Sequence, residues 1–479
     1  MTDLPRVTIL GAGPAGVAAA HALSKAGKAR VEVLERAGQA GGNSSSFQIE
    51  GIWCDYGSHR FHPVADPQVI ADVKALLGED LLLQPRHGRI RLGGRWIHFP
   101  LKPLDALLRL PPRFAARLFG DMLAKPFRKR RQGARSFSSV LYDGLGPTIS
   151  ESFYFPYVRK LWGLAPDHLA VTLAERRVSS GSVGKILGKM LRMLPGMKGP
   201  TTGRFYYPRK GFGQITAAMV DASRGGGVDY AFGAEILRIE RQGSRVTGVV
   251  TKGTNGEQRH EADQVFSTIP LTSLVRLMDP PAPEEVQKAA AAIRFRGMIL
   301  VYLILKTDRF TEFDAHYFPE LSIPISRMSE PKNYNSARGP AGLTILCAEL
   351  PCDPGEVWWG MSDAELGAHY VRWLNDLGLP VPCAVLRCET RRIGQAYPVY
   401  DLDYQRHFEV VDGWLSSLEG LLSVGRQGLF ARGSFCNHGA HRKFSLDWLA
   451  PSSNPKKTII STQAWRLRMS PHSFRVSVA

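Results

Sequence analysis

The sequence contains few cysteines, and their spacing suggests neither a metal site nor a redox pair. Six cysteines occur among 479 residues, with no Cys-x-x-Cys pair and no His/Cys spacing typical of metal ligands. We expect reduced, buried thiols, as in cytoplasmic proteins. The sequence also lacks a Ser-His-Asp motif and a phosphate-cradling Walker loop.

Long apolar runs are missing as well. The longest candidate, Gly297–Leu305, has nine residues and is typical of a buried strand, whereas a membrane-spanning helix needs about 20 apolar residues. A strand is expected to begin almost directly after Met1, which leaves no room for a signal peptide. We therefore expect a cytoplasmic protein, either soluble or peripheral on the inner face of the membrane.

Acidic residues are outnumbered by basic ones. The 43 acidic and 61 basic residues give a formal net charge of +18, while the hydrophobic content of 44% is ordinary for a globular protein. This charge favours phosphate-bearing ligands, anionic membrane surfaces or nucleic acid, without choosing among them. No nucleic-acid-binding module is apparent, so we expect a small-molecule substrate, and the oligomeric state stays open.

A dinucleotide-binding fingerprint lies close to the start of the chain. A short apolar run ends at Gly11, an alanine-rich helical run follows, and a second apolar run, Val31–Leu34, is closed by Glu35. Gly11 permits a tight turn, Gly13 lets the backbone approach a pyrophosphate, and Gly16 allows the helix to pack closely on the strand. The positive end of the helix dipole would bind the phosphates, and Glu35 would accept hydrogen bonds from ribose hydroxyls.

Two further motifs follow the fingerprint. Gly38–Phe47 is rich in glycine and serine and is expected to be a loop that faces the ligand, and an Asp-x-Gly-x-His-x-Phe motif occupies Asp55–Phe61. With the fingerprint, they resemble the glutathione-reductase-type FAD superfamily. The resemblance covers most of the chain and points to the branch of amine oxidases, protoporphyrinogen oxidases, phytoene desaturases and UDP-galactopyranose mutases.

The resemblance implies FAD as cofactor and an α/β fold, with a Rossmann FAD-binding domain interleaved with a mixed helical and sheet substrate domain. We expect a discontinuous FAD-binding domain at residues 1–75, 205–275 and 391–479, a helical part at 76–204 and a sheet part at 276–390. The expected strands are Glu235–Glu240, Arg245–Thr251, Gln264–Thr268, Met298–Leu305, Ser322–Ser326 and Leu343–Leu350. Residues 66–204 are expected to be mostly helical, with loops at Pro85–Pro103.

A second informative region, Arg391–Phe430, predicts a helix at Asp403–Leu421, a strand, and a loop that begins near Gly425. Ligands of open α/β sheets bind at such strand ends. Its Tyr-Pro-Val segment and Gly-Arg-x-Gly turn resemble UDP-galactopyranose mutases, although the final pattern of the mutases is missing. Tyr154–Gly163 resembles a helix that lines the substrate cavity in relatives, and packing of core aromatics is the alternative.

The candidate catalytic residues are His59, His62, Arg426 and Tyr397. Near-neutral imidazoles can donate to the flavin or move protons, or they only cap the turn. Arg426 can stabilise negative charge, or it is a surface arginine; Tyr397 can bind a diphosphate oxygen, or it is a packed aromatic. No metal ligands are expected. The residues that the resemblance places at the cofactor are Gly11, Gly13, Pro14, Ala15, Gly16, Glu35, Arg36, Gly41, Gly42, Asn43, Gly57, Ser58, His59, Gly425 and Arg426.

These features indicate an FAD-dependent oxidoreductase of the amine oxidase/protoporphyrinogen oxidase-like group, which removes a hydride from an organic substrate. The alternative is a flavin-dependent sugar isomerase similar to UDP-galactopyranose mutase, and a flavin-binding remnant without turnover is a third reading. Two further segments carry expectations. The basic amphipathic run Leu110–Arg135 suggests peripheral contact with an anionic membrane; the alternative is a solvated basic loop, because Pro126 breaks the helix. The tail after Phe430 lacks helical periodicity and is expected to be mobile, or else ordered but diverged.

Overall fold

The structure, a computed structural model, describes residues 4–100, 105, 108–127, 135–177, 203–253, 256–335 and 339–431. Two sequence-based expectations fall outside these residues. One concerns the tail after Phe430, of which the structure describes only Ala431. The other concerns the basic residues at 128–131, which were expected to contact a membrane.

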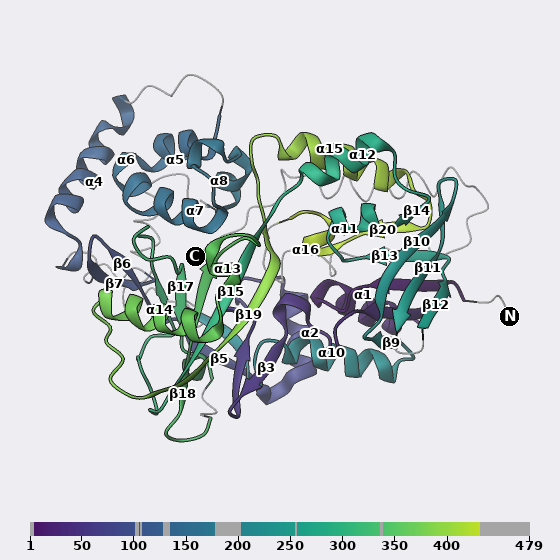
Figure 1. The fold of residues 1–479 in the computed structure, drawn as a ribbon, viewed down its shortest axis with the longest axis horizontal. Helices are drawn as coiled ribbons and strands as arrows, with labels where there is room; N and C mark the ends of the chain where they lie inside the picture. Colours follow the sequence, from purple (N-terminus) through teal and green to yellow (C-terminus); the bar gives the residue numbers. More distant parts are fainter. Residues whose placement is uncertain are drawn as a thin grey trace.

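Five parallel strands form the sheet that carries the fingerprint (Figure 1). Their order is β20 (Leu421–Ser423), β13 (Gln264–Ser267), β1 (Arg6–Leu10), β2 (Arg30–Glu35) and β9 (Asp229–Phe232). Both faces are covered, as expected for a parallel sheet. Val7 and Ile9 lie in a core with α1 (Pro14–Ala26), α2 (Pro67–Leu77) and α10 (Gln214–Gly225). Leu10 lies in another core with α11 (Leu271–Arg276), α12 (Glu284–Ala292) and α15 (Tyr404–Ser417).

A four-stranded sheet lies beside the parallel one. Its strands are β12 (Gly256–Glu261), β11 (Arg245–Gly253), β10 (Glu235–Gln242) and β14 (Met278–Asp279). The three expected strands of this region, including β13 of the parallel sheet, are present, and β12 was not anticipated. Its sequence GEQRHE is polar and mostly exposed, so it has no apolar alternation to reveal it.

The largest sheet has seven strands. Their order is β19 (Val385–Pro398), β15 (Phe295–Leu305), β18 (Thr344–Pro351), β17 (Arg327–Ser329), β16 (Ala315–Tyr317), β6 (Gly88–Leu92) and β7 (Arg95–Phe99). The amphipathic helix α14 (Asp363–Asp376) packs its apolar face in a core shared with β15 and β18.

Two expectations about this sheet were wrong. The loops expected at Pro85–Pro103 contain β6 and β7, a hairpin whose strands are joined at Gly93 and Gly94, both with positive φ. Such φ values suit a tight hairpin turn. The strand expected at Ser322–Ser326 is not formed, and β17 begins one residue later, because Pro324 has no N–H to donate to a ladder.

A helical layer lies at one end of the molecule (Figure 1). It comprises α4 (Pro112–Ala124), α5 (Phe137–Leu145), α6 (Pro147–Ile149), α7 (Phe155–Trp162) and α8 (Val171–Arg177). In α7, Trp162 is buried in the core and its Nε1 donates to Pro398 O at 3.1 Å, so core packing explains this aromatic residue. None of the described helices combines the length and the apolar character that crossing a bilayer requires.

Candidate functional site

The turn between β1 and α1 is built by glycines. Gly11 has φ +94°, and its N–H donates to Leu34 O at 2.8 Å, which ties the turn to β2. A Cβ at Gly16 would lie 1.9 Å from Gly11 O, so only glycine lets α1 approach this closely. A Cβ at Gly13 would meet nothing within 4 Å, and no side chain caps the helix there. The space above the first turn of α1, around Pro14 and Ala15, is therefore open to an anion.

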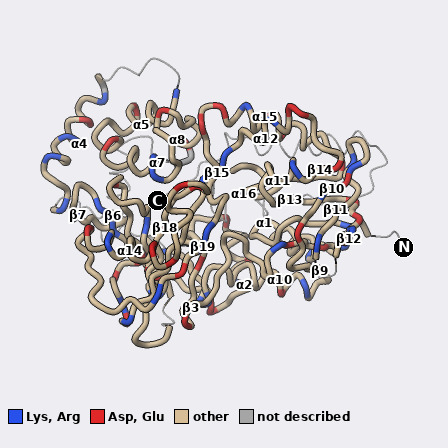
Figure 2. Tube along the Cα trace, viewed as in Figure 1, with Lys and Arg blue, Asp and Glu red and all other residues tan. Residues whose placement is uncertain are grey.

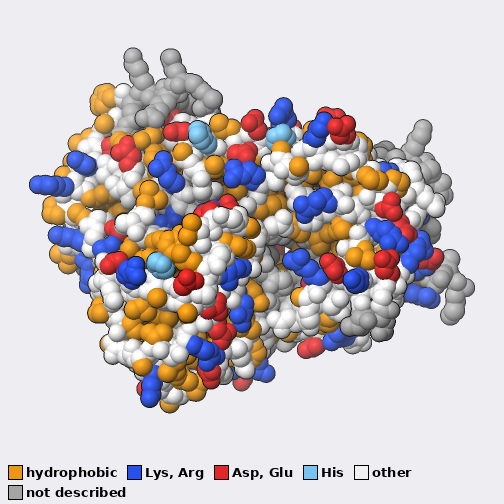
Figure 3. Space-filling model, in the orientation of Figure 1, with side chains coloured by type: hydrophobic (Ala, Val, Ile, Leu, Met, Phe, Trp, Pro, Cys, Tyr) orange, Lys and Arg blue, Asp and Glu red, His pale blue; other side chains and the backbone are white. Residues whose placement is uncertain are grey.

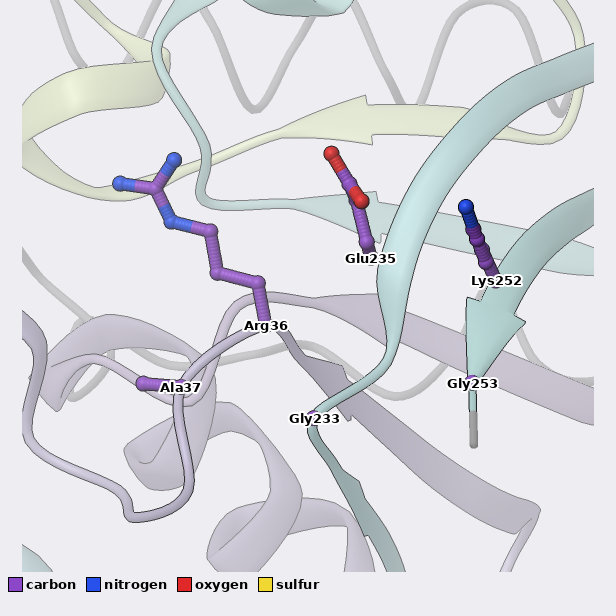
Figure 4. Close-up of a pocket in the computed structure, with 6 residues that line it drawn as sticks. All are labelled: Arg36, Ala37, Gly233, Glu235, Lys252 and Gly253. Carbon is purple, nitrogen blue, oxygen red and sulfur yellow. The ribbon is translucent and has the colours of Figure 1, made fainter. Parts of the chain in front are cut away.

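Glu35 is fixed toward this turn. Its carboxylate, 9% exposed, accepts from Ala12 N–H at 2.7 Å and from Ala37 N–H at 2.9 Å. Each carboxylate oxygen keeps a second lone pair for a hydroxyl donor. Beside Glu35 lies a hollow of about 600 Å³ (Figure 4), lined by Arg36, Ala37, Gly233, Glu235, Lys252 and Gly253. Arg36, Glu235 and Lys252 project to the same side of it.

The Gly-Gly loop docks on the same turn. Gly41 N–H donates to Ala12 O at 2.8 Å, and a Cβ at Gly42 would lie 3.4 Å from Gly13 Cα. Both glycines have positive φ, which favours glycine over other residues. Asn43 follows them in the short 3₁₀ helix Gly42–Ser44 and is half-buried. Two motifs about 30 residues apart in the sequence therefore border one space.

A second loop leads from β4 (Ile52–Asp55) into the Asp-x-Gly-x-His motif. Gly57 has φ +97°, and Ser58 N–H donates to Glu349 Oε1 at 2.9 Å. His59 lies with Nε2 3.0 Å from Tyr56 O, which assigns the proton to Nε2. The buried Asp55 carboxylate accepts from Tyr207 Oη–H at 2.7 Å, from Phe212 N–H at 2.9 Å and from Ser46 Oγ–H.

The two histidines of this loop are neutral at pH 7. Burial lowers the pKa of His59, and the nearby Asp55 carboxylate offsets this only in part. Burial, followed by Arg86 and Arg60, lowers the pKa of His62 to about 4. Each imidazole is thus a hydrogen-bonding group rather than a cation, and His62 is poorly suited to protonate a substrate near neutral pH.

Three arginines, Arg60, Arg86 and Arg327, form an arginine cluster next to this loop. The Arg60 side chain, 8% exposed, donates to Tyr317 Oη at 3.1 Å and to Tyr334 Oη at 3.3 Å, and it lies 3.3 Å from Asp314. Its Nε is buried without a hydrogen-bond partner. The Arg86 guanidinium lies 5.1 Å from the centre of the Phe99 ring.

Arg327 connects the cluster to the loop. It pairs with Glu349 and donates to Ser58 O at 3.2 Å, and its guanidinium lies 5.9 Å from the Tyr317 ring. Burial raises the pKa of Tyr317, but Arg60, Arg327 and Arg86 outweigh it, and the pKa is lowered overall. Around this hydroxyl the three arginines thus outweigh the Asp314 carboxylate.

Arg426 and Tyr397 meet at the other side of the site. The Arg426 guanidinium lies 5.5 Å from the centre of the Tyr397 ring and donates to Ala396 O, while its Nε is buried without a partner. Arg426 is half-buried rather than a surface arginine, and burial lowers its pKa. Gly425, with φ +78°, brings α16 (Gly425–Gly428) against the start of α1, because a Cβ there would lie 2.6 Å from Ala15 Cβ.

The structure thus brings together most of the residues that the sequence predicts for the site. Gly425 reaches the fingerprint turn, and the adjacent Arg426 lies against the Tyr397 ring. His62 lies beside Arg86 and Arg60 instead. Sequence reasoning missed the arginine cluster and its tyrosines, since they come from loops and strands far apart in the sequence; Arg60, inside the Asp-x-Gly-x-His-x-Phe motif, was the one available signal. The described residues contain no group of His, Cys, Asp and Glu that could hold a metal ion.

Comparison with known proteins agrees with this geometry. The family model for "Flavin containing amine oxidoreductase" matches residues 14–391. A Mycobacterium tuberculosis protein, AofH, named as a flavin-containing monoamine oxidase, is 28% identical over 299 residues. The match covers 59% of this chain and 61% of AofH, so the chain spans about three fifths of this relative's length.

Solved structures share the fold. Reduced UDP-galactopyranose mutase superposes with a TM-score of 0.75 at 21% identity, covering 89% of both chains. A protein from Exiguobacterium sp. 255-15, described as a protoporphyrinogen oxidase, superposes with a TM-score of 0.68 at 17% identity and covers 89% of this chain and 95% of its own. At these identities the likeness concerns the fold alone, which is the expected FAD-binding α/β architecture.

Proposed function

This chain belongs to the family of flavin containing amine oxidoreductases, and we propose that it is an FAD-dependent oxidoreductase that removes a hydride from a small organic substrate. One observation carries this proposal. The N-terminus of α1 is bordered by site residues, namely the fingerprint turn, Glu35, the Gly-Gly loop and Gly425. These are the positions at which a dinucleotide binds in a Rossmann domain.

FAD is the cofactor of this family, and the residues present fit it. The open space at Gly13 suits a pyrophosphate, the remaining lone pairs of Glu35 suit ribose hydroxyls, and the hollow beside Arg36 suits the adenosine half. The unpartnered Nε of Arg426 suits an acceptor at the flavin end. When bound, FAD supplies the hydride acceptor, and the protein supplies position and electrostatics.

The chain's own residues would then position the reactants. Neutral His59 and the Gly57–Ser58 backbone border the flavin side, and the Asp55 network holds that loop in place. Arg426 would stabilise negative charge that develops on the reduced cofactor or on the substrate. His62 would accept or donate a hydrogen bond as a neutral imidazole, because its pKa is about 4.

The arginine cluster supports a substrate that carries a phosphate or carboxylate rather than an amine. Arg327 donates to Ser58 O, one residue from His59, so the cluster begins beside the flavin side of the site. The lowered pKa of Tyr317 indicates a positive potential there, which would repel an ammonium group and attract an anion. Guanidinium groups also match the oxygen pairs of carboxylates and phosphates.

Anaerobic mixing tests this proposal. We expect that, within a panel of phosphate-bearing alcohols, carboxylate-bearing alcohols and primary amines, only anionic members reduce the flavin and remove its visible absorbance. Arg60→Leu combined with Asp314→Asn should lower the second-order rate constant of flavin reduction about 10- to 100-fold, as expected for the loss of one charged hydrogen bond to the substrate. Arg209→Leu, at a 41% exposed side chain paired with Asp80, should have no effect. Reduction by amines alone would contradict the substrate class.

A sugar isomerase similar to UDP-galactopyranose mutase is the second candidate. One observation favours it: Arg426 and Tyr397 are adjacent and can bind a diphosphate. Dithionite-reduced protein incubated with UDP-galactopyranose separates the two functions. Formation of the furanose would select the isomerase, and unchanged substrate would leave the oxidoreductase.

A further inference from the structure

The helix α4 exposes large apolar side chains to solvent. None of its 13 residues is buried, and Phe119 and Leu123 are each 61% exposed. Phe127, in the 3₁₀ helix Lys125–Phe127 that follows, is 87% exposed, and Leu108, just before α4, is 74% exposed. Among the residues that the structure describes, few large apolar side chains are as exposed, and these four lie within 20 residues of sequence.

The opposite face of α4 is docked on the protein. Phe114, Leu118 and Met122 are half-buried, Asp121 Oδ2 accepts from Thr148 N–H at 2.8 Å, and Lys125 Nζ donates to Gly144 O at 2.8 Å. Phe114, Leu118 and Met122, which recur at helical spacing, therefore face the protein, and Lys125 is bound by it. The expected contact of this run with an anionic membrane stays a prediction.

The outer face therefore has a defined orientation. Phe119 and Leu123 are four residues apart and lie together on one side of the outer face. Arg113 and Arg117, also four residues apart, lie together on the adjoining side. Both arginines are exposed. Asp121 is the one acid of α4, and it faces Thr148. Figure 2 shows basic residues along α4, and Figure 3 shows hydrophobic and basic side chains interspersed at this end of the molecule.

We propose that the outer face of α4, with Phe119, Leu123 and Phe127 inserted and Arg113 and Arg117 on phosphate groups, docks on an anionic lipid surface. Aromatic and leucine side chains enter the boundary between headgroups and acyl chains, and arginines beside them bind anionic headgroups. The net charge of +18 adds a favourable long-range attraction. A second copy of the chain is a poorer partner, because the same arginines would face one another across a symmetric contact.

Vesicle co-sedimentation tests the proposal on the full-length protein. Vesicles of phosphatidylcholine with about 30% phosphatidylglycerol should bind the protein, and pure phosphatidylcholine vesicles should bind it at least about tenfold more weakly, since each arginine near an anionic surface contributes about 1 kcal/mol. Binding should fall steeply between about 0.1 M and 1 M salt, as the screening length shortens from about 10 Å to about 3 Å. Equal binding to both vesicle types at all salt concentrations would overturn the proposal.

Matched variants locate the contact. Phe119→Ser with Leu123→Ser should weaken binding at least about tenfold, and so should Arg113→Gln with Arg117→Gln. The controls are Val64→Ser, which removes an apolar side chain that is 77% exposed elsewhere, and Lys28→Gln, which removes an exposed charge elsewhere; both should bind as the wild type does.

Unchanged thermal unfolding and flavin content would show that each variant is folded. Undiminished vesicle binding by both double variants would mean that general positive charge, not α4, attracts the protein. A dimer in light scattering that the apolar double variant abolishes, without any vesicle binding, would replace the lipid by a second copy of this chain. Either outcome overturns the proposal, and neither depends on which reaction the flavin site catalyses.

Discussion

Two glycines of the first turn, Gly13 and Gly16, are required for different reasons. A Cβ at Gly16 would overlap Gly11 O at 1.9 Å, whereas a Cβ at Gly13 enters open space. We therefore expect Gly16→Ala to lower the free energy of unfolding by about 2–3 kcal/mol, as overpacking does, and Gly13→Ala to change it by less than about 1 kcal/mol. Urea denaturation measures both, and equal losses would contradict the assignment of Gly16 to packing.

Lys160 gives the stability an unusual pH dependence. It is buried, its Nζ donates to Phe318 O at 2.6 Å and to Ile325 O at 3.0 Å, and burial lowers its pKa from 10.5 to about 7. Between these values the unfolded chain binds more protons than the folded one, so the stability rises with pH. The free-energy cost of burying the charged Lys160 is present in full below pH 7, and it disappears above the pKa of 10.5 that this lysine has in the unfolded chain.

The difference between the wild type and Lys160→Met isolates this effect. Relative to the variant, the wild type should gain about 2 kcal/mol of unfolding free energy between pH 7 and pH 9. Loss of the two carbonyl contacts shifts the variant by a nearly constant amount and leaves the slope untouched. Parallel stability curves for the two proteins over this range, measured by denaturant titration, would show that Lys160 keeps an ordinary pKa.

At the scale of elements, Asp55 joins three segments. It ends β4, and its carboxylate accepts from Ser46 in β3 (Ser46–Ile49), from Tyr207 in β8 (Arg204–Pro208) and from the Phe212 backbone. Asp55→Ala leaves these buried donors without an acceptor, so we expect a loss of about 2–4 kcal/mol in unfolding free energy and weaker retention of FAD. Asp55→Asn keeps a hydrogen-bond acceptor, so it should lose less unfolding free energy and retain more FAD than Asp55→Ala. If the two variants were equally stable, the hydrogen bonds would not be what holds the loop.

Local motifs explain which elements were predictable. The fingerprint turn, Glu35 and the β1, β2 and β13 strands follow from short apolar runs and glycines adjacent in the sequence. The helix expected at Asp403–Leu421 is confirmed as α15, with a shorter end at Ser417. By contrast, β12 has no apolar period. The β6–β7 hairpin joins the seven-stranded sheet through pairing of β6 with β16, more than 200 residues away, so no local pattern marks it as part of that sheet.

The candidate site divides in the same way. The Gly-Gly loop is recognisable because its residues are consecutive. The arginine cluster is not, because Arg60 and Arg327 meet only when the seven-stranded sheet packs against the Asp-x-Gly-x-His loop. The predicted division into a discontinuous FAD-binding domain and an interleaved substrate domain stays a prediction, as does the role of each cofactor-binding residue.

At the scale of the whole molecule, β4 and the loop after it, which border the site, are bonded to the seven-stranded sheet. Ser58 and Glu349 are joined by a hydrogen bond, Arg60 and Tyr317 by another, and Tyr302 Oη–H donates to Asp55 O at 2.6 Å. A ligand bound here binds the folded chain and not the unfolded chain, and so stabilises the folded state. Added FAD should therefore raise the midpoint of thermal unfolding in a concentration-dependent way. If the midpoint of thermal unfolding did not change with FAD concentration, FAD would not bind at this site.

The flavin content of the purified protein, compared with that of Gly13→Val, tests the central claim most directly. Valine fills the open space above the first turn of α1 without meeting any protein atom at its Cβ, so the variant should fold while losing the pyrophosphate site. We predict that the wild type is yellow, with close to one FAD per chain, and that the folded variant is colourless. The same flavin absorbance per protein in both would contradict the proposed cofactor site.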